Sequence, residues 1–261
     1  MRSIVQILSS ILLPIIFVSG DIFDKHWISE KQDGYNLHFC SPDAPSKVEY
    51  VNIIENGRTT VNQFFGAPYA RSFDIYIHPN RNSLDSTWQK DWQVPDFKSE
   101  CWMVASGVAS KLDMISPIRW DTDACEHHYA DKIATRRLVT HELVHVYHGQ
   151  LNISPDFSEI EGIDWFVEGL ATYASGQCDS SRLSEIKNAI VENKVPDSLD
   201  KFWTGKLKYG LSGSMVMFID KRYGRGKLTS LLRIGKKAEM LAALKTTESD
   251  LLTEWKNHFG R

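Results

Sequence analysis

Two histidines four residues apart in an otherwise apolar segment place the strongest constraint on the fold of this chain. The segment RRLVTHELVHVYHGQL, residues 136–151, carries His141 and His145, with Glu142 directly after the first. Residues four apart in an α-helix lie about 40° apart around its axis, so the two imidazoles can converge on one point. Burying them beside a charged Glu142 is costly unless a partner is present. The segment predicts a helix over about 129–151, with its buried positions at Ile133, Leu138, Val144 and Leu151 and with Arg136 and Arg137 outward.

A metal ion is the partner that this spacing favours. Zinc accepts imidazole nitrogens at about 2.0–2.1 Å. Glu142 lies about 100° around the helix from His141, where it can reach a water molecule bound to such an ion more easily than the ion itself. His148 is a poor additional ligand, because three ligands from one straight helix converge badly. The alternative is two hydrogen-bonded histidines on an ordinary surface helix.

A catalytic zinc takes three protein ligands and leaves one position open for water. The best candidate for the third ligand is Glu168, the one acid inside the apolar run WFVEGLATYA of a second predicted helix at 163–176. A lone carboxylate in such a helix needs a partner, and Gly169 leaves room for another helix to approach. Asp164, one turn earlier, is the second choice. Glu159 and Glu161 are interpreted as solvated loop acids.

The two motifs together resemble a known family. H-E-L-V-H is followed by W-F-V-E-G-L-A-T-Y, whose glutamate lies 23 residues after the second histidine. This pair is similar to the motif pair of the gluzincin zinc metallopeptidases, most closely the peptidase MA-like group. The resemblance implies one catalytic zinc held by His141, His145 and Glu168, with Glu142 as the catalytic base.

The resemblance also bears on two further positions. A tyrosine at the start of a later helix stabilises the oxyanion in aminopeptidase relatives, and Tyr209 in KYGLSGSMVMFIDKRYG occupies a comparable place; a tyrosine that caps the helix is the alternative. The Gly-Met-Glu-Asn stretch that binds a free N-terminus in those relatives is absent, and residues 106–109 read Ser-Gly-Val-Ala instead. This departure puts aminopeptidase specificity in doubt and leaves an endopeptidase open.

The expected function is therefore that of a secreted zinc-dependent metallopeptidase acting on a peptide or protein substrate, which a strand around 101–107 could bind by edge pairing. The alternative is a secreted non-catalytic zinc-binding or peptide-binding module with a peptidase-like fold. Net charge of -3 and a pI near 6.3 do not fit a basic nucleic-acid binder.

The N-terminus MRSIVQILSSILLPIIFVSG has one basic residue, an apolar run and a small-residue end, which is typical of a secretory signal peptide cleaved after Gly20. A retained anchor is the alternative, but the run is shorter than the ~20 apolar residues of a membrane span. We therefore expect a secreted or periplasmic protein with no stable membrane span after signal removal. Four cysteines then suggest two disulfides, with Cys101–Cys125 preferred and buried free thiols as the alternative.

Strand patterns crowd the first half of the chain and helical patterns fill the second, which indicates an α+β fold. Strands are predicted at 35–40 and 72–79, with one or two more within 101–118, and a helix is predicted between 41 and 66. Joined with the resemblance, this predicts a small mixed sheet whose N-terminal helix packs on the zincin helix, followed by a helical part. The expected divisions are 1–20 as signal peptide, 21–151 as the mixed α/β subdomain and 152–261 as the helical subdomain carrying the third ligand.

Overall fold

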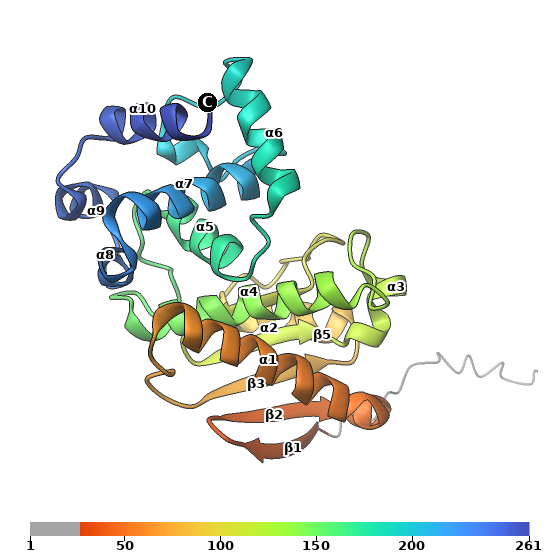
Figure 1. The fold of residues 1–261 in the computed structure, drawn as a ribbon. Coiled ribbons are helices and arrows are strands. Elements are labelled where there is room, and N and C mark those ends of the chain that lie inside the picture. The colour runs from red at the N-terminus through yellow and green to blue at the C-terminus, as the bar shows by residue number, and fades with distance from the viewer. Residues whose placement is uncertain (1–26, 261) are drawn as a thin grey trace, which may run out of the picture.

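The computed structural model describes residues 27–260 and shows a mixed α+β fold (Figure 1). The predicted signal peptide lies outside the described residues. Five strands form one sheet in the order β1-β2-β3-β5-β4, and helices α5 to α10 form a separate layer beyond α4. The strands are β1 (Trp27–Gln32), β2 (Tyr35–Cys40), β3 (Phe73–His78), β4 (Ala105–Val108) and β5 (Lys111–Ile115).

The sheet is mixed in direction, as the sequence predicts. Strands β2, β3 and β5 run parallel, while β1 and β4 are antiparallel edge strands. Alternating apolar residues such as Leu37 and Ile75 are fully buried in the core between the sheet and the helices. Strand β1 and helix α2 (Arg81–Asp91) were not anticipated, because their polar residues give weak apolar periodicity.

Helix α1 (Lys47–Phe65) crosses α4 on one face of the sheet (Figure 1). A short 3-10 turn, η1 (Ser41–Ser46), precedes it, and Gly66 in a left-handed conformation ends it at the glycine that the sequence marked. Gly57 makes the crossing close, since a Cβ there would lie 2.7 Å from the side chain of Leu143. The helix therefore fixes α4 against the sheet.

Helix α4 (Lys132–Leu151) begins where Asp131 accepts hydrogen bonds from the backbone N–H groups of Ile133 and Ala134. Residues 138–150 are buried with few exceptions, as expected for a helix enclosed on several sides. The prediction that Ile133 is buried is wrong. Its side chain is exposed, because Ile133 lies on the solvent side of the start of the helix, where Thr135 is the buried residue.

The segment before β4 is fastened by the disulfide Cys101–Cys125, the pairing preferred from the sequence. The expectation of a second disulfide is wrong: Cys40 and Cys178 are buried in separate places and are not joined. Cys40 ends β2 in the sheet, whereas Cys178 lies against Gly213 in the helical layer. Two short elements, η2 (Pro117–Arg119) and α3 (Trp120–Asp123), follow β5.

The helical layer begins with α5 (Asp164–Ala174), which packs closely on α7 (Lys208–Tyr223). A Cβ at Gly169 would lie 2.3 Å from the carbonyl oxygen of Ser212, so the glycine permits this approach. The remaining elements are α6 (Ser180–Val191), η3 (Leu199–Lys201), α8 (Arg225–Leu231), α9 (Lys237–Leu244) and α10 (Glu248–Phe259).

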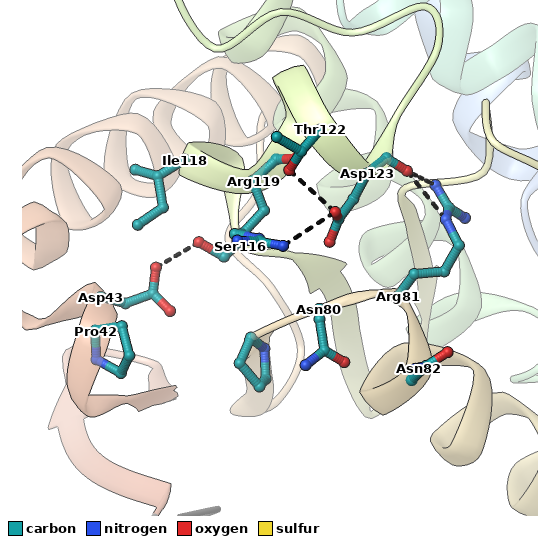
Figure 2. Close-up of a pocket in the computed structure, with 11 residues that line it drawn as sticks. Pro42, Asp43, Asn80, Arg81, Asn82, Ser116, Ile118, Arg119, Thr122 and Asp123 are labelled. Atoms are coloured by element: carbon teal, nitrogen blue, oxygen red, sulfur yellow. Dashed lines mark hydrogen bonds and ion pairs between the residues drawn. The ribbon is translucent and has the colours of Figure 1, made fainter. Parts of the chain in front are cut away.

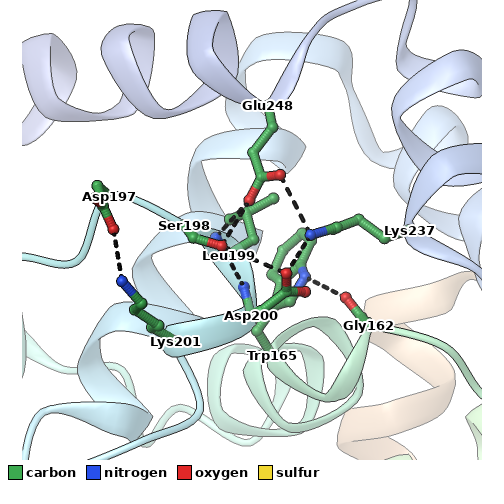
Figure 3. A network of polar contacts seen from close by, with 9 residues as sticks. All are labelled: Gly162, Trp165, Asp197, Ser198, Leu199, Asp200, Lys201, Lys237 and Glu248. Atoms are coloured by element: carbon green, nitrogen blue, oxygen red, sulfur yellow. Dashed lines mark hydrogen bonds and ion pairs between the residues drawn. The ribbon is translucent and has the colours of Figure 1, made fainter.

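Polar contacts join the far end of this layer to the start of α5 (Figure 3). Lys237 forms ion pairs with Asp200 at 2.6 Å and Glu248 at 3.2 Å, and Glu248 also accepts from the Leu199 backbone N–H. The Trp165 indole donates to the Gly162 carbonyl at 3.1 Å. The Lys237 backbone N–H donates to the Glu161 carbonyl at 2.9 Å, which joins this part of the layer to the chain that leads into α5. Among residues 27–260, no helix combines the length and apolar character needed to cross a bilayer.

Candidate metal centre

His141, His145 and Glu168 converge at the contact between α4 and α5. The Nε2 atoms of the two histidines are 3.0 Å apart, and Oε2 of Glu168 lies 3.4 Å from the first and 3.7 Å from the second. Ligand atoms on a tetrahedral zinc with bonds of about 2.0–2.2 Å are about 3.3–3.6 Å apart. The three atoms therefore have a spacing that suits one small divalent ion.

The orientation of His141 also fits a metal ligand. Its Nδ1 lies 2.9 Å from Oε1 of Gln177, which can only accept, so Nδ1 carries the hydrogen and Nε2 keeps a free lone pair. That lone pair faces a second imidazole nitrogen and a carboxylate. Metal-bound histidines characteristically donate their other ring N–H to such an acceptor. A cation between the three groups would resolve this concentration of acceptor atoms.

Glu168 is brought to the histidines by α5, and its side chain is 27% exposed. Burial alone would raise the pKa of its carboxyl group, but His145 and His141, when protonated, lower that pKa through their positive charge and the hydrogen bonds that they donate. It is therefore ionised, as a metal ligand must be. Asp164, the second choice from the sequence, is exposed at the start of α5 and does not join the cluster.

Glu142 lies beside the cluster without entering it. Burial raises the pKa of its carboxyl group to about 7; Glu168 adds to the rise, whereas His141 and the Gly107 backbone oppose it. A carboxyl group that titrates near neutral pH can both accept and return a proton. Gly107 of β4 lies directly against this turn of α4, since a Cβ there would be 2.3 Å from the Glu142 carbonyl oxygen.

Tyr209 stands at the start of α7, with its ring centroid 6.4 Å from that of His141. Burial, Glu168 and Glu142 raise the pKa of its hydroxyl, while Arg182 opposes them. The hydroxyl therefore stays protonated and is a hydrogen-bond donor at neutral pH. Tyr209, a candidate from the sequence, therefore lies at the site beside the histidines.

His148, which the sequence indicates to be a poor metal ligand, is fully buried and lies outside the cluster. Its Nε2 lies 3.3 Å from the Asn152 amide nitrogen, and the rings of Phe157 and Phe166 pack around it. It belongs to the core behind the site.

The cluster opens into a cleft between β4 and the helical layer. Two hollows of about 340 Å³ and 420 Å³ share the walls Trp102, Met103, Ala105, His141, Glu142 and Tyr209. The first extends toward the N-terminal half of α4, and the second contains His145 and Glu168. The cleft therefore gives access to the cluster and to the two side chains that could act on a bound molecule.

A larger cavity of about 550 Å³ lies elsewhere, where β2, β3 and β5 end (Figure 2). Its buried carboxylate, Asp43, already accepts hydrogen bonds from Tyr50 and Ser116. The Arg81 guanidinium donates to the carbonyl groups of residues 100, 101, 103 and 123 and so fastens the disulfide-bonded segment. No group of three potential metal ligands is found there among the described residues. We therefore assign no chemistry to this cavity.

Gln177 and Gly107 are site residues that the sequence analysis did not select. Gln177 follows the helix-ending Gly176 in an irregular segment, and no local pattern indicates that it reaches His141. Gly107 did carry a signal, because a glycine within a strand often marks the close approach of another backbone.

Comparison of the chain with protein-family models gives no match, and no curated protein matches it either.

Proposed function

We propose that this protein is a secreted zinc metallopeptidase of the gluzincin type, which hydrolyses peptide bonds in the cleft between β4 and α5. The observation that carries the proposal is the convergence of His141, His145 and Glu168 from two helices, with Glu142 beside them in an open cleft. A structural metal site is closed by four protein ligands, whereas a catalytic one has three and leaves a position open. Three ligands and an adjacent carboxyl group fit the catalytic kind.

Each residue of the site has a distinct role in this proposal. When bound, zinc would lower the pKa of a water molecule to about 7 and polarise the substrate carbonyl. Glu142 accepts a proton from the attacking water and delivers it to the leaving amine, for which a pKa of about 7 is suitable. The Tyr209 hydroxyl donates a hydrogen bond to the oxygen that becomes negatively charged. Gln177 keeps His141 in the tautomer and orientation that ligation requires.

The proposed location outside the cytoplasm rests on two features. The sequence begins with a segment typical of a signal peptide. The Cys101–Cys125 disulfide beside the cleft is the kind of bond that persists in oxidising compartments. Expression of the full chain with detection of the mature protein outside the cytoplasm, followed by sequencing of its N-terminus, tests this part.

The substitution Glu142→Gln tests the catalytic assignment. It keeps the shape of the side chain and removes the group that accepts the proton. We expect peptide hydrolysis to fall by about 10²–10⁴-fold, the usual contribution of positioned acid–base catalysis, with zinc content unchanged. Glu161→Gln, at an exposed residue paired with Lys236, is the matched control and should retain activity. Full activity in the zinc-loaded Glu142→Gln protein would refute the base. A zinc-bound wild type that cleaves no peptide in a broad library would favour a non-catalytic module.

A further inference from the structure

The hollow toward the N-terminal half of α4 has a distinct chemistry. Its floor is apolar and formed by Ala134 and Leu138, and its inner end is formed by His141 and Glu142. The wall also includes uncharged residues such as Trp102, Val104 and Gln177. Its charged side chains come from α4, from the segment that begins α6 and from the loop after the disulfide. A side chain that enters this hollow would be next to the proposed reaction centre.

Two arginines face this hollow, with one carboxylate between them. Asp179 forms an ion pair with Arg137 at 3.1 Å and accepts from the Arg182 backbone N–H at 3.2 Å. The Arg182 guanidinium instead lies 5.1 Å from the centre of the Tyr209 ring, and no ion pair with it is present among residues 27–260. The inner wall therefore has two positive charges and one negative charge. Arg182 is the cation left available for a ligand.

Glu126 is the other carboxylate of the lining outside the reaction centre. It is exposed on the loop after Cys125, whereas Arg182 is half-buried against Tyr209. Electrostatic interactions weaken in solvent-exposed positions and strengthen where water is excluded. Arg182 therefore has the stronger influence on a side chain at the inner end, and Glu126 affects only the outer rim.

The direction of β4 indicates which part of a substrate reaches this hollow. Gly107 lies against Glu142, and Ala109 lies against Gly149 at the end of α4, so strand and helix run the same way. Because β4 is an edge strand, an extended peptide can add to it, and antiparallel addition gives the more stable pairing. The C-terminal half of that peptide then lies beside Val104 and Ala105, at this hollow.

We propose that the hollow receives an acidic side chain from the residue that directly follows the cleaved bond, and that Arg182 determines this specificity. The inference rests on the proposed peptidase function, because it uses the cleft and the position of Glu142. An aspartate or glutamate carboxylate would accept hydrogen bonds from the guanidinium of Arg182, the geometry in which arginine binds carboxylates well. The substrate class is therefore peptides with an acidic residue after the scissile bond.

Binding to the zinc-loaded Glu142→Gln protein tests the inference without turnover. The probes are blocked hexapeptides, acetyl-Ala-Ala-Phe-X-Ala-Ala-amide, with Glu, Gln or Lys at X, measured by calorimetry. We expect the Glu peptide to bind about tenfold more tightly than the Gln peptide, as for a charge-assisted hydrogen bond. Adding Arg182→Gln should abolish this difference, and Arg182→Glu should make the Lys peptide the tightest. Arg136→Gln, exposed on α4 and outside the hollow, is the matched control and should keep the Glu preference.

Cleavage of a peptide library by the wild-type protein separates the inference from the proposed function. Enrichment of Asp and Glu directly after the bond, lost in Arg182→Gln, supports both. Cleavage with no acidic preference, or with the preference before the bond, overturns the inference and leaves the peptidase intact. An absence of cleavage together with Arg182-dependent binding supports the acidic pocket and overturns the peptidase. Equal binding of the Glu and Gln peptides overturns the inference.

Discussion

Two buried histidine groups in this protein show how a metal site differs from a structural hydrogen-bond network. At the end of β3, His78 has a complementary partner at each ring nitrogen: the Ser83 hydroxyl at 3.1 Å and the Asp113 carboxylate at 3.0 Å. On α4, the Nε2 atoms of His141 and His145 face each other at 3.0 Å. Both groups are almost completely buried, so burial alone does not separate them.

The difference lies in the balance of donors and acceptors. The His78 group is complete without a ligand, and Lys111 further compensates Asp113 through an ion pair at 2.8 Å. The α4 group places two imidazole nitrogens and the Glu168 carboxylate around one point, where one added cation can satisfy all three at once. A buried histidine therefore predicts a metal only where its outward nitrogen lacks a complementary partner.

The largest expected effect follows from removing one proposed ligand. His145→Ala should lower zinc affinity by more than about 100-fold, since even indirect changes around a zinc site cost about 10–100-fold. The measurement is metal content after dialysis against zinc buffers, determined by mass spectrometry. His128→Ala is the control, because that exposed histidine pairs with Asp121 at the surface. If His145→Ala retained one equivalent of zinc, His141 and His145 would not form a metal site, and the contrast with the His78 network would not hold.

The sequence was sufficient to select the residues of the His141, His145 and Glu168 cluster, but not the residues around it. Helical spacing placed His141, Glu142 and His145 on one side of α4, and the apolar context of Glu168 marked that residue as needing a partner. These inferences depend on local geometry, which residue spacing specifies. Gln177 and Arg182 reach the site through the fold of α5, α6 and α7, for which no short-range pattern exists.

The same distinction explains the fold predictions. Strands β2 and β3 and helices α1, α4 and α5 alternate or repeat their apolar residues clearly, and they were predicted correctly. The prediction of a second disulfide was wrong, because an even number of cysteines carries no information about the distance between two thiols. The edge position of β4, on which substrate binding depends, follows from strand pairing and is not visible in residues 105–108.

A stability effect of intermediate size is expected at the His78 network. His78→Ala leaves Ser83 and Asp113 buried without this partner, which should cost about 2–3 kcal/mol of unfolding free energy. His38 makes a similar pair of contacts, with Ser29 and Asp74, but its site is more exposed. His38→Ala should therefore cost less than about 1 kcal/mol. Chemical denaturation gives both values, and zinc content should stay unchanged. Zinc loss in His78→Ala would show that the two histidine groups are coupled.

The smallest effect concerns His148, a buried histidine that belongs to neither group. Burial lowers the pKa of its imidazole to about 3; nearby His145 adds to the decrease, and hydrogen bonding to the Leu232 backbone opposes it. The unfolded chain binds a proton near pH 6.5, whereas the native state stays neutral down to about pH 3, so stability falls as pH decreases through that window. The loss from pH 6.5 to 5 should be about 2 kcal/mol.

His148→Phe removes this titration in a pocket already lined by Phe157 and Phe166. Between pH 6.5 and 5 the wild type should lose about 2 kcal/mol more unfolding free energy than the variant, both measured with chelator so that metal binding does not contribute. The difference in slope is informative even if the variant is less stable overall. Parallel curves would mean that His148 takes up a proton in the native state as readily as in the unfolded chain.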